Sequence, residues 1–513
     1  MIDKLSLPCL AQSDIVIAGA GPAGISAAIA AARQGFQVLL LEQTGALGGM
    51  ATSGLVPMFA PSSDGVRVLY GGIFPEILDE MCRRMKSDVN NGWQIINPEI
   101  LKYLLDEKIR AEKNIKVFFN VKICEAEVTD GKINAVLAAT SQGLKRIEGK
   151  QFIDATGDGL LAMLAGAEYQ YGDSEGNTQA PTMCCQYSNI DYEKEAQAAK
   201  KGIYPHTCWY ELLKTNTAPL MEHHLACIKR TSPATSGTNL GHVYGADTLD
   251  ESGLTECYFE GRRQAHIFEE FFRTKVPGYE NAELVNTAAL MGVRETRRIV
   301  GEYQLTANDY FARADFEDEI GRCSYPVDRH AATKDATAQN AALIDLAASK
   351  YQKGESYGIP YRVMIPKGLK NLLVPGRALS ADQIAQASVR IMPACFVTGQ
   401  AAGIAAGLAD VQCSACGKIC DHSEWDDNRQ CLICHEFLGV DLLQIEFYMD
   451  GEYCGCTSTI EHTVGEQLMY QFWRSWEDLT STYDVYVGDL LVTDASYMIL
   501  ESCNIYLVTR SNE

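Results

Sequence analysis

One six-residue motif constrains the fold of this chain more than any other feature: Gly19-Ala20-Gly21-Pro22-Ala23-Gly24. An apolar run at 14–18 precedes it. An alanine-rich segment at 22–34 follows, with proline in the first turn, where its missing N–H costs nothing. Residues 37–42 form a second apolar run that ends in Glu42. The succession of strand, glycine turn, helix and strand predicts a βαβ unit that binds a dinucleotide.

Each glycine of the motif has a physical role in such a unit. Gly19 permits the tight turn, Gly21 lets the backbone approach a pyrophosphate, and Gly24 lets the helix pack closely on the strand. The helix N-terminus directs N–H groups and a positive dipole at the phosphates. Glu42 lies 18 residues after Gly24 and is placed to accept hydrogen bonds from a ribose diol.

A second small-residue loop, 45–52, follows the acidic residue directly. NAD-binding domains need no such loop, whereas FAD has a diphosphate and ribityl chain that continue past the first βαβ unit. The loop therefore favours FAD, and a plain flexible loop is the alternative.

Composition limits the other possibilities. A chain of 513 residues exceeds one ordinary core, so two or three domains are expected. The formal net charge of −22 argues against nucleic acid or an anionic membrane as the main partner. The longest apolar stretch, 15–41, is interrupted by polar residues, and residues 1–14 lack the pattern of a signal peptide. A cytoplasmic location is expected.

The chain is expected to alternate between strands and helices up to residue 170. Helical spacing at 98–113 is followed by strand-like runs at 115–121, 125–128 and 133–138, with a hairpin turn at Asp130-Gly131. No nucleotide motif occurs at 171–365, which is interpreted as an inserted α+β substrate domain. A strand at 371–375 and a small-residue helix at 398–408 predict a return segment of the FAD-binding domain at 366–409.

Residues 13–409 resemble the FAD-dependent oxidoreductases of the glutathione-reductase-like flavoprotein superfamily. Beyond the glycine motif, the resemblance rests on four parts of the chain: 48–52 (GGMAT), 152–159 (FIDATGDG), 292–298 (GVRETRR), and 371–377 (NLLVPGR) running through 388–393 (SVRIMP) to 399–403 (GQAAG). The family resemblance implies a Rossmann-type α/β fold, in which residues 13–170 form the first part of the FAD-binding domain.

The resemblance also implies where the cofactor lies. Ala155, Thr156 and Gly157 would pass the FAD diphosphate, and a backbone amide at Val121 would meet the adenine. Gly376, Arg377 and Asp382 would approach the ribityl chain and flavin, and Arg390 would precede a helix N-terminus near the flavin pyrimidine. The remaining predicted contacts come from the glycine motif and the segment after it: Gly19, Ala20, Gly21, Pro22, Ala23, Gly24, Glu42, Gln43, Gly48, Gly49, Met50 and Ala51.

Candidate catalytic groups are few. Residues 45–60 contain no cysteine, which disfavours a thiol–disulfide reductase, and the adjacent Cys184 and Cys185 are interpreted as two buried thiols. On a helix, Arg294 would share a face with Arg298, and an arginine fork suits a carboxylate. The alternative is a salt-bridged structural helix.

His330 follows Tyr325-Pro326-Val327-Asp328 and could act as a general acid or base, although a single histidine is more often structural. Arg390 is the third candidate catalytic residue, with a surface salt bridge as the alternative. The predicted reaction is hydride or electron transfer between FAD and a small polar or anionic molecule. The alternative is an electron-transfer or scaffold protein that docks a partner through the C-terminal module.

The last hundred residues differ from the rest. From 410 to 513 there are 19 acidic and 4 basic residues, and 8 of the 18 cysteines lie there. Two CxxC pairs, separated by 14 residues, predict a zinc ribbon at 411–436 with ligands Cys413, Cys416, Cys431 and Cys434. A haem attachment site at 431–435 or an iron–sulfur site including Cys420 are the alternatives, and Cys420, His422 or His435 could replace one ligand.

Alternating runs at 483–487, 490–492 and 499–508 predict a small sheet after the ribbon. This acidic module is interpreted as a site for a protein partner or for self-association, with no role in nucleic-acid binding.

Overall fold

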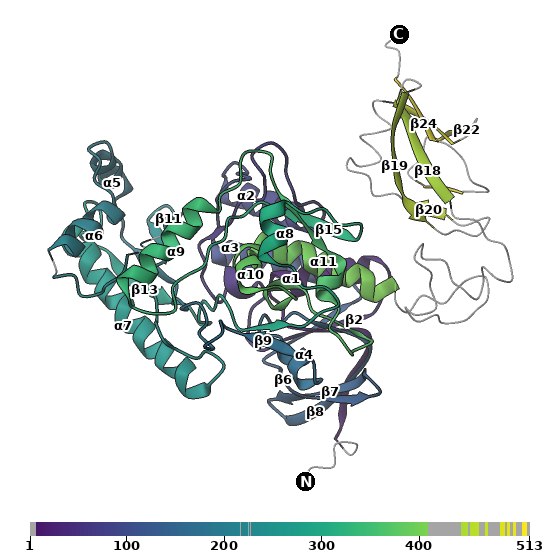
Figure 1. The fold of residues 1–513 in the computed structure, drawn as a ribbon, viewed down its shortest axis with the longest axis horizontal. Coiled ribbons are helices and arrows are strands. Elements are labelled where there is room, and N and C mark those ends of the chain that lie inside the picture. Colours follow the sequence, from purple (N-terminus) through teal and green to yellow (C-terminus); the bar gives the residue numbers. More distant parts are fainter. Residues whose placement is uncertain are drawn as a thin grey trace. The chain divides into compact units, whose positions relative to one another are not determined.

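The computed structural model describes residues 7–408 except 216, 224 and 226, together with the backbone of strands between 443 and 509. The chain divides into two compact units, Met1–Gly407 and Leu408–Glu513. The ribbon is shown in Figure 1.

A seven-stranded sheet is the centre of the first unit, with strand order β5-β2-β1-β8-β7-β6 and β17 paired to β8. β1, β2, β5 and β17 belong to its parallel part, in which β1 pairs with both β2 and β8. β6, β7 and the first half of β8 form an antiparallel meander. The strands are β1 (Cys9–Ala18), β2 (Val38–Glu42), β5 (Ile115–Phe119), β6 (Lys122–Thr129), β7 (Lys132–Thr140), β8 (Gly143–Asp154) and β17 (Leu372–Leu373).

The predicted βαβ unit is confirmed. Residues 15–18 and 38–42 are buried along their whole length, as expected of central parallel strands covered on both faces. α1 (Pro22–Arg33) connects them and is buried over most of its residues. α11 (Met392–Leu408) packs against α1 so closely that a Cβ on Gly403 would lie 2.2 Å from the Ala27 carbonyl oxygen. The return segment is thereby attached to the first helix of the chain.

Helices cover one face of the sheet with the larger core, and the meander with α4 (Leu160–Leu164) encloses the other. The segment at 98–113 forms α3 as its spacing predicts, with Asn97 as N-cap accepting from the amides of Glu99 and Ile100. The helices of the larger core, besides α1 and α11, are α2 (Ile73–Met85), α3 (Pro98–Ala111), α8 (Ala307–Ala312) and α10 (Gln383–Val389).

Short elements complete this body and carry parts of the site. Three two-stranded pairs connect segments distant in sequence: β3 (Met58–Phe59) with β4 (Gln94–Ile95), β9 (Tyr169–Tyr171) with β14 (Arg297–Ile299), and β15 (Glu319–Cys323) with β16 (Tyr357–Pro360). The other helices of this body are η2 (Gly49–Ala51), α9 (Ala336–Ala348), η3 (Tyr361–Met364) and η4 (Gly376–Ala378).

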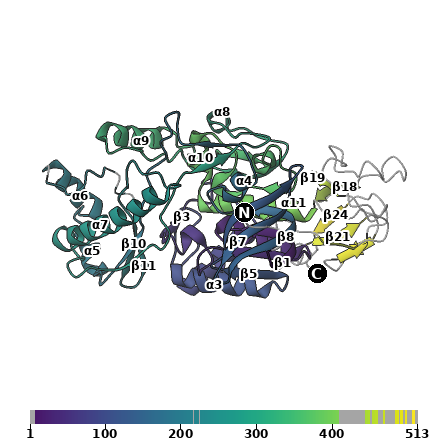
Figure 2. The same cartoon turned by 90° about the horizontal axis from the view of Figure 1, so that it is seen from below.

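Residues 183–291 form a further core around a four-stranded antiparallel sheet of order β11-β12-β10-β13. Figures 1 and 2 both place its helices at one end of the unit, away from α1 and α11. Contact clustering keeps this region within the first unit, so the division at 171–365 stays a prediction. Its elements are β10 (Cys185–Ser188), α5 (Tyr192–Ala199), α6 (Pro205–Lys214), β11 (Cys227–Ser232), β12 (Thr235–Asn239), α7 (Glu251–Lys275) and β13 (Glu283–Thr287).

Among the described residues, no single helix is long and apolar enough to cross a membrane. α10 and α11 meet that criterion only together, with a 93° bend between them, and both are largely buried in the protein.

The second unit contains a five-stranded sheet of order β19-β18-β24-β21-β22 and a pair, β20 with β23. The predicted strands at 483–487 and 490–492 are present, and residues 505–508 of the predicted run at 499–508 lie in β24, whereas its residues 499–504 lie outside the described residues. β23 and β24 occupy separate segments because they pair in different sheets. The strands are β18 (Leu443–Met449), β19 (Glu452–Ile460), β20 (Gln467–Met469), β21 (Tyr483–Val487), β22 (Leu490–Val492), β23 (Ser496–Met498) and β24 (Ile505–Thr509). The predicted zinc ligands Cys413, Cys416, Cys431 and Cys434 lie outside the described residues.

Candidate functional site

The carboxylate of Glu42 lies beside the glycine turn, as the sequence predicts. It is buried at the end of β2, where Oε2 accepts the Ala20 amide at 2.8 Å and Oε1 accepts the Thr44 amide at 2.7 Å. Since two carboxylate oxygens offer about four acceptor positions, capacity remains for ribose hydroxyls. Gln43, the next residue, is exposed.

The glycine turn leaves space at the N-terminus of α1. A Cβ on Gly24 would lie 1.8 Å from the Gly19 carbonyl oxygen, so the close packing of the helix on the strand requires glycine at this position. A Cβ on Gly21 would meet no atom within 4 Å. Gly21 is the N-cap, has no side chain to cap the helix, and precedes Pro22 and Ala23. The first amides of a helix lack intrahelical acceptors, so this opening fits a diphosphate.

The second glycine loop packs directly on the first turn. Gly48 donates its amide to the Ala20 carbonyl at 2.9 Å, and a Cβ on Gly49 would lie 2.9 Å from the Gly21 Cα. Met50, in η2 with Ala51, lines a cavity described below. The second loop and the glycine turn are therefore adjacent in space.

Two distant stretches meet at the same place. Ala155 donates its amide to the Ala18 carbonyl at 2.8 Å, which places 155–157 beside the glycine turn. Across from it, Arg377 donates to Asp158 Oδ1 at 2.6 Å, and its guanidinium lies 3.0 Å from where a Cβ on Gly157 would be. Thr156 is fixed by the buried Asp154 carboxylate, and Gly376 by a hydrogen bond from its amide to Thr398.

Two of the implied cofactor contacts are engaged within the protein instead. The Val121 amide donates to the Glu42 carbonyl at 3.0 Å, so it is not available to an adenine. Asp382 is the N-cap of α10, where Oδ1 accepts the Ala385 amide at 2.8 Å and Oδ2 accepts the Ala307 amide at 2.7 Å. Its carboxylate therefore stabilises the start of α10.

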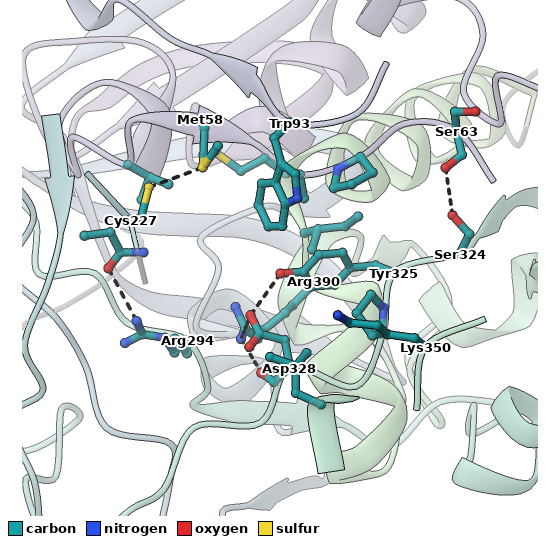
Figure 3. Close-up of a pocket in the computed structure, with 18 of the residues that line it drawn as sticks. Met58, Ser63, Trp93, Cys227, Arg294, Ser324, Tyr325, Asp328, Lys350 and Arg390 are labelled. Atoms are coloured by element: carbon teal, nitrogen blue, oxygen red, sulfur yellow. Dashed lines mark hydrogen bonds and ion pairs between the residues drawn. The ribbon is translucent and has the colours of Figure 1, made fainter. Parts of the chain in front are cut away.

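A cavity of about 820 Å³ opens beside these elements, within the range of small-molecule sites. Three parts of the chain form its walls: the loop at 56–65, the four-stranded sheet β11-β12-β10-β13 with 292–294, and the segments at 324–330 and 346–355. Arg377, Arg390 and Met392, at the start of α11, complete it from the return segment. Figure 3 shows Arg294, Asp328 and Arg390 directed toward the same space.

Positive charge dominates the lining. It holds three carboxylates, and each has an arginine partner: Asp64 pairs with Arg67, Asp328 with Arg390 and Glu355 with Arg313. The six cations of the lining are Lys229, Arg294, Lys350, Lys353, Arg377 and Arg390. Among the described residues, the Nε atoms of Arg377 and Arg390 are buried without a hydrogen-bond acceptor. The cavity therefore favours an anionic occupant.

Arg294 is a buried cation held by neutral oxygens. Its Nη1 donates to the Ala180 carbonyl at 2.7 Å and to Thr182 Oγ1 at 2.9 Å, and Nη2 lies 3.4 Å from Asn239 Oδ1. Burial, together with the charge of Arg390, lowers the pKa of Arg294 to about 10, so it stays charged at neutral pH. No carboxylate within the described part of the chain forms an ion pair with it.

The expected helix around Arg294 is wrong. Gly292 forms an antiparallel bridge with Thr182, which holds the backbone extended, and 297–299 forms strand β14. Arg298 consequently points away from the cavity and pairs with the buried Glu295. A contact with Thr182, more than a hundred residues away in sequence, overrides the local helical spacing.

His330 and Arg390 converge on Asp328, a residue without a role in the sequence prediction. Arg390 Nη2 donates to the Asp328 carbonyl at 2.7 Å, and Tyr325 donates its hydroxyl to Asp328 Oδ2 at 3.0 Å. Asp328 Oδ1 lies 3.4 Å from His330 Nε2. Burial, and then the charge of Arg294, lower the pKa of His330 well below its ordinary value. The three predicted catalytic residues therefore lie in one cavity.

Cysteines in this region are thiols. Cys184 and Cys185 are buried and unpaired, as predicted. Cys184 and Cys227 line the cavity, and the Cys227 thiol lies 3.2 Å from the Met58 sulfur. Among the residues that the structure describes, no group of three or more His, Cys, Asp or Glu side chains could hold a metal ion.

Comparison with known proteins agrees with this geometry. A family model described as FAD dependent oxidoreductase matches residues 14–418. Curated proteins give no match. Among solved structures, a geranylgeranyl bacteriochlorophyll reductase-like protein from Thermoplasma acidophilum is 12% identical, with a TM-score of 0.39 over 78% of each chain.

A triple mutant of the flavin-dependent brominase Bmp2 is 13% identical, with a TM-score of 0.38 over 77% of this chain and 80% of that one. The p-nitrophenol 4-monooxygenase PnpA from Pseudomonas putida is 13% identical, with a TM-score of 0.34 over 57% and 71%. These similarities are too distant to bear on the substrate.

Proposed function

The chain belongs to the FAD-dependent oxidoreductase family, and from this we propose that it transfers hydride or electrons between FAD and a small anionic organic molecule. The cavity beside the glycine turn is the proposed reaction site. Arg294, His330 and Arg390 are its proposed catalytic residues.

One observation carries the choice of an anionic substrate. Arg294 is buried, charged and held only by neutral oxygens among the described residues, and it faces a cavity whose cations outnumber its carboxylates. Burying a charge without an opposite charge is costly. A substrate carboxylate or phosphate at Arg294 would offset that cost and fix the orientation of the substrate.

The remaining roles follow from the contacts. FAD, when bound, supplies the redox chemistry, and the protein binds and orients. The ADP half of FAD would be held by the N-terminus of α1 and by Glu42. The flavin end or the substrate could accept hydrogen bonds from the buried Nε atoms of Arg377 and Arg390. His330 would hold or move the proton that accompanies oxidation or reduction of the substrate.

An anaerobic screen tests this proposal. The purified full-length protein is mixed with single carboxylates, phosphorylated sugars, neutral sugars or amines while flavin absorbance is followed. Rapid bleaching by an anionic compound is the expected result. Protein that carries no flavin would contradict the proposal. Flavin that responds to no small molecule, but exchanges electrons with a partner protein, would support the electron-transfer alternative.

A further inference from the structure

One side of the cavity changes from charged to apolar directly beside Arg294. Arg294 Nη2 lies 3.4 Å from Asn239 Oδ1, and Asn239 on β12 pairs with Cys227 on β11. The Cys227 thiol in turn lies 3.2 Å from the Met58 sulfur. Figure 3 shows Cys227 between Met58 and Arg294 along this side of the cavity. A ligand whose anionic group reaches Arg294 therefore has two sulfur-bearing side chains beside its next atoms.

The same side of the cavity continues from Met58 to an indole ring. Met58 on β3 pairs with Ile95 on β4, and Trp93 lies two residues before Ile95. Trp93 lines the cavity, is 47% exposed, and meets the Tyr325 ring edge to face, with 5.8 Å between the ring centroids. Cys227, Met58 and Trp93 thus form one continuous surface, the apolar wall of the cavity.

Arg294 differs from the other cations of the cavity in its need for an anion. Arg377 and Arg390 each pair with a carboxylate, and the lysines of the lining are half-buried or exposed. Arg294 is only 8% exposed and, within the described part of the chain, forms no ion pair with a carboxylate. One anionic group, placed at the end of the apolar wall, is therefore enough to offset the buried charge.

The chemistry of the apolar wall favours an aromatic ring next to that anionic group. Thioethers are polarizable and make favourable contacts with rings, and Met50 and Met392 line the same cavity as Met58. The indole of Trp93 offers a further ring to stack on or to meet edge to face. A sugar or a second carboxylate placed against this wall would lose hydrogen bonds to water without replacing them.

We propose that the cavity binds an aromatic carboxylic acid, with its carboxylate at Arg294 and its ring against Met58 and Trp93. Arg294 fixes one end of the molecule, and the apolar wall selects the body attached to it. Met58 and Trp93 are therefore specificity-determining residues. The assignment rests on the proposed function only in naming this acid as the substrate, since its binding to the cavity can be measured without any reaction.

The first test compares four small probes that differ in one property at a time. Phenylacetate, cyclohexylacetate, succinate and the uncharged phenylacetamide are titrated into the full-length flavin-bound protein, and calorimetry gives each Kd. Phenylacetate should bind most tightly. Phenylacetamide should bind roughly 10- to 100-fold more weakly, because it lacks the charge that meets Arg294. Cyclohexylacetate should bind roughly 2- to 10-fold more weakly, because its saturated ring has no π-system.

Two results of this comparison would overturn the proposal. Succinate that binds as tightly as phenylacetate would show that the cavity selects a second charge and not an apolar body. Cyclohexylacetate that binds as tightly as phenylacetate would show that the wall selects apolar surface without regard to aromaticity.

The second test assigns the preference to Trp93. Trp93→Ala should raise the Kd of phenylacetate roughly 2- to 10-fold and that of cyclohexylacetate less, and Trp93→Phe, which keeps a ring, should restore most of the affinity. The matched control is Phe259→Ala, because Phe259 is an aromatic residue on α7 that is 61% exposed and lies outside the cavity lining. Equal affinities in Trp93→Ala and Phe259→Ala would overturn the role of the indole.

The outcomes keep this inference separate from the proposed function. Trp93-dependent binding of phenylacetate by a protein that never takes up flavin would support the aromatic-acid site and refute the proposed function. Flavin that is bleached by a small polar acid, equally fast in Trp93→Ala and in the natural protein, would overturn the aromatic-acid site and leave the proposed function intact.

Discussion

The side-chain oxygen of Gln179 accepts the backbone N–H of His330 at 3.1 Å, across 151 positions of sequence. The Gln179 amide donates to Gln386 Oε1 at 3.2 Å, and Gln386 donates to the Arg294 carbonyl at 3.0 Å. Two buried glutamines therefore tie together the backbones of the two residues proposed to orient substrate and move a proton. Such a network fixes geometry only if every member is satisfied.

Replacing Gln179 with leucine is expected to lower the free energy of unfolding by about 1–3 kcal/mol, the usual cost of leaving buried polar groups without partners. Chemical denaturation measures the change. Gln304→Leu is the matched control, because Gln304 donates to Gln170 Oε1 at 2.9 Å on the surface and should cost less than about 0.5 kcal/mol. Equal losses in the two variants would refute a special role for the buried pair.

Gly21→Ala should fold normally but lose FAD. The added Cβ enters open space at the N-terminus of α1, where the diphosphate is expected, so FAD affinity should fall roughly tenfold or more, or about 1.4 kcal/mol. The flavin-to-protein absorbance ratio of dialysed protein measures it. Gly71→Ala also adds a Cβ in open space, in the segment before α2 and not at the N-terminus of α1, and should keep its flavin. Full flavin content in Gly21→Ala would place the diphosphate elsewhere.

The cavity thiols should be unreactive at neutral pH. Burial raises the pKa of Cys227 to about 12, and only the thiolate is nucleophilic, so roughly one in ten thousand is ionised at about pH 8. Alkylation by iodoacetamide, mapped by mass spectrometry, should modify the exposed Cys9 and Cys124 and spare Cys227. The Cys227 rate should keep rising with pH, without a plateau below about pH 10. Fast modification near neutrality would point to an activated cysteine.

The elements that the sequence predicts correctly are those that depend on local patterns of residues. The βαβ unit, α3 and the Asp130-Gly131 hairpin each depend on neighbours within about thirty residues. In addition, Gly24 has the close-packing role that its spacing indicates, and Glu42 lies beside the glycine turn.

The site depends on contacts that spacing does not encode. His242 and His330 are 88 positions apart, and Glu222 precedes His242 by 20, so nothing in the sequence indicates that these side chains lie in contact. Asp328 lies two residues before His330, but spacing alone predicts no role for it, because its partners Tyr325 and Arg390 come together with it only in space. The spacing of the arginines predicts a helix around Arg294 because it cannot reveal the bridge between Gly292 and Thr182.

The cysteine spacing of the C-terminal unit predicts one bound zinc ion per chain. Elemental analysis of protein purified without added metal should find it, and Cys413→Ser with Cys416→Ser should remove most of it, because losing one CxxC pair leaves two thiolate ligands. Cys454→Ser, outside both pairs, is the control. Iron with visible charge-transfer absorbance, rather than zinc, would support the iron–sulfur alternative.

Arg294→Gln should strongly weaken the binding of an anionic ligand. Its effect on the fold of the FAD site should be small. A hydrogen bond to a charged group contributes about 1.5–3 kcal/mol, which corresponds to roughly 10- to 100-fold in Kd. The ligand is the carboxylate or phosphate that perturbs the flavin spectrum most strongly in the anaerobic screen, and spectral titration gives its Kd.

Two variants make that measurement specific to position 294. Arg263→Gln removes an exposed arginine paired with Glu260 on α7 and should leave Kd unchanged. Arg294→Lys keeps the charge but loses the fork, so it should lie between the natural protein and Arg294→Gln. If Arg294→Gln retains its flavin and binds the anion as well as the natural protein does, the anion is held by other cations of the cavity, and the orientation of the substrate against His330 has to be reassigned.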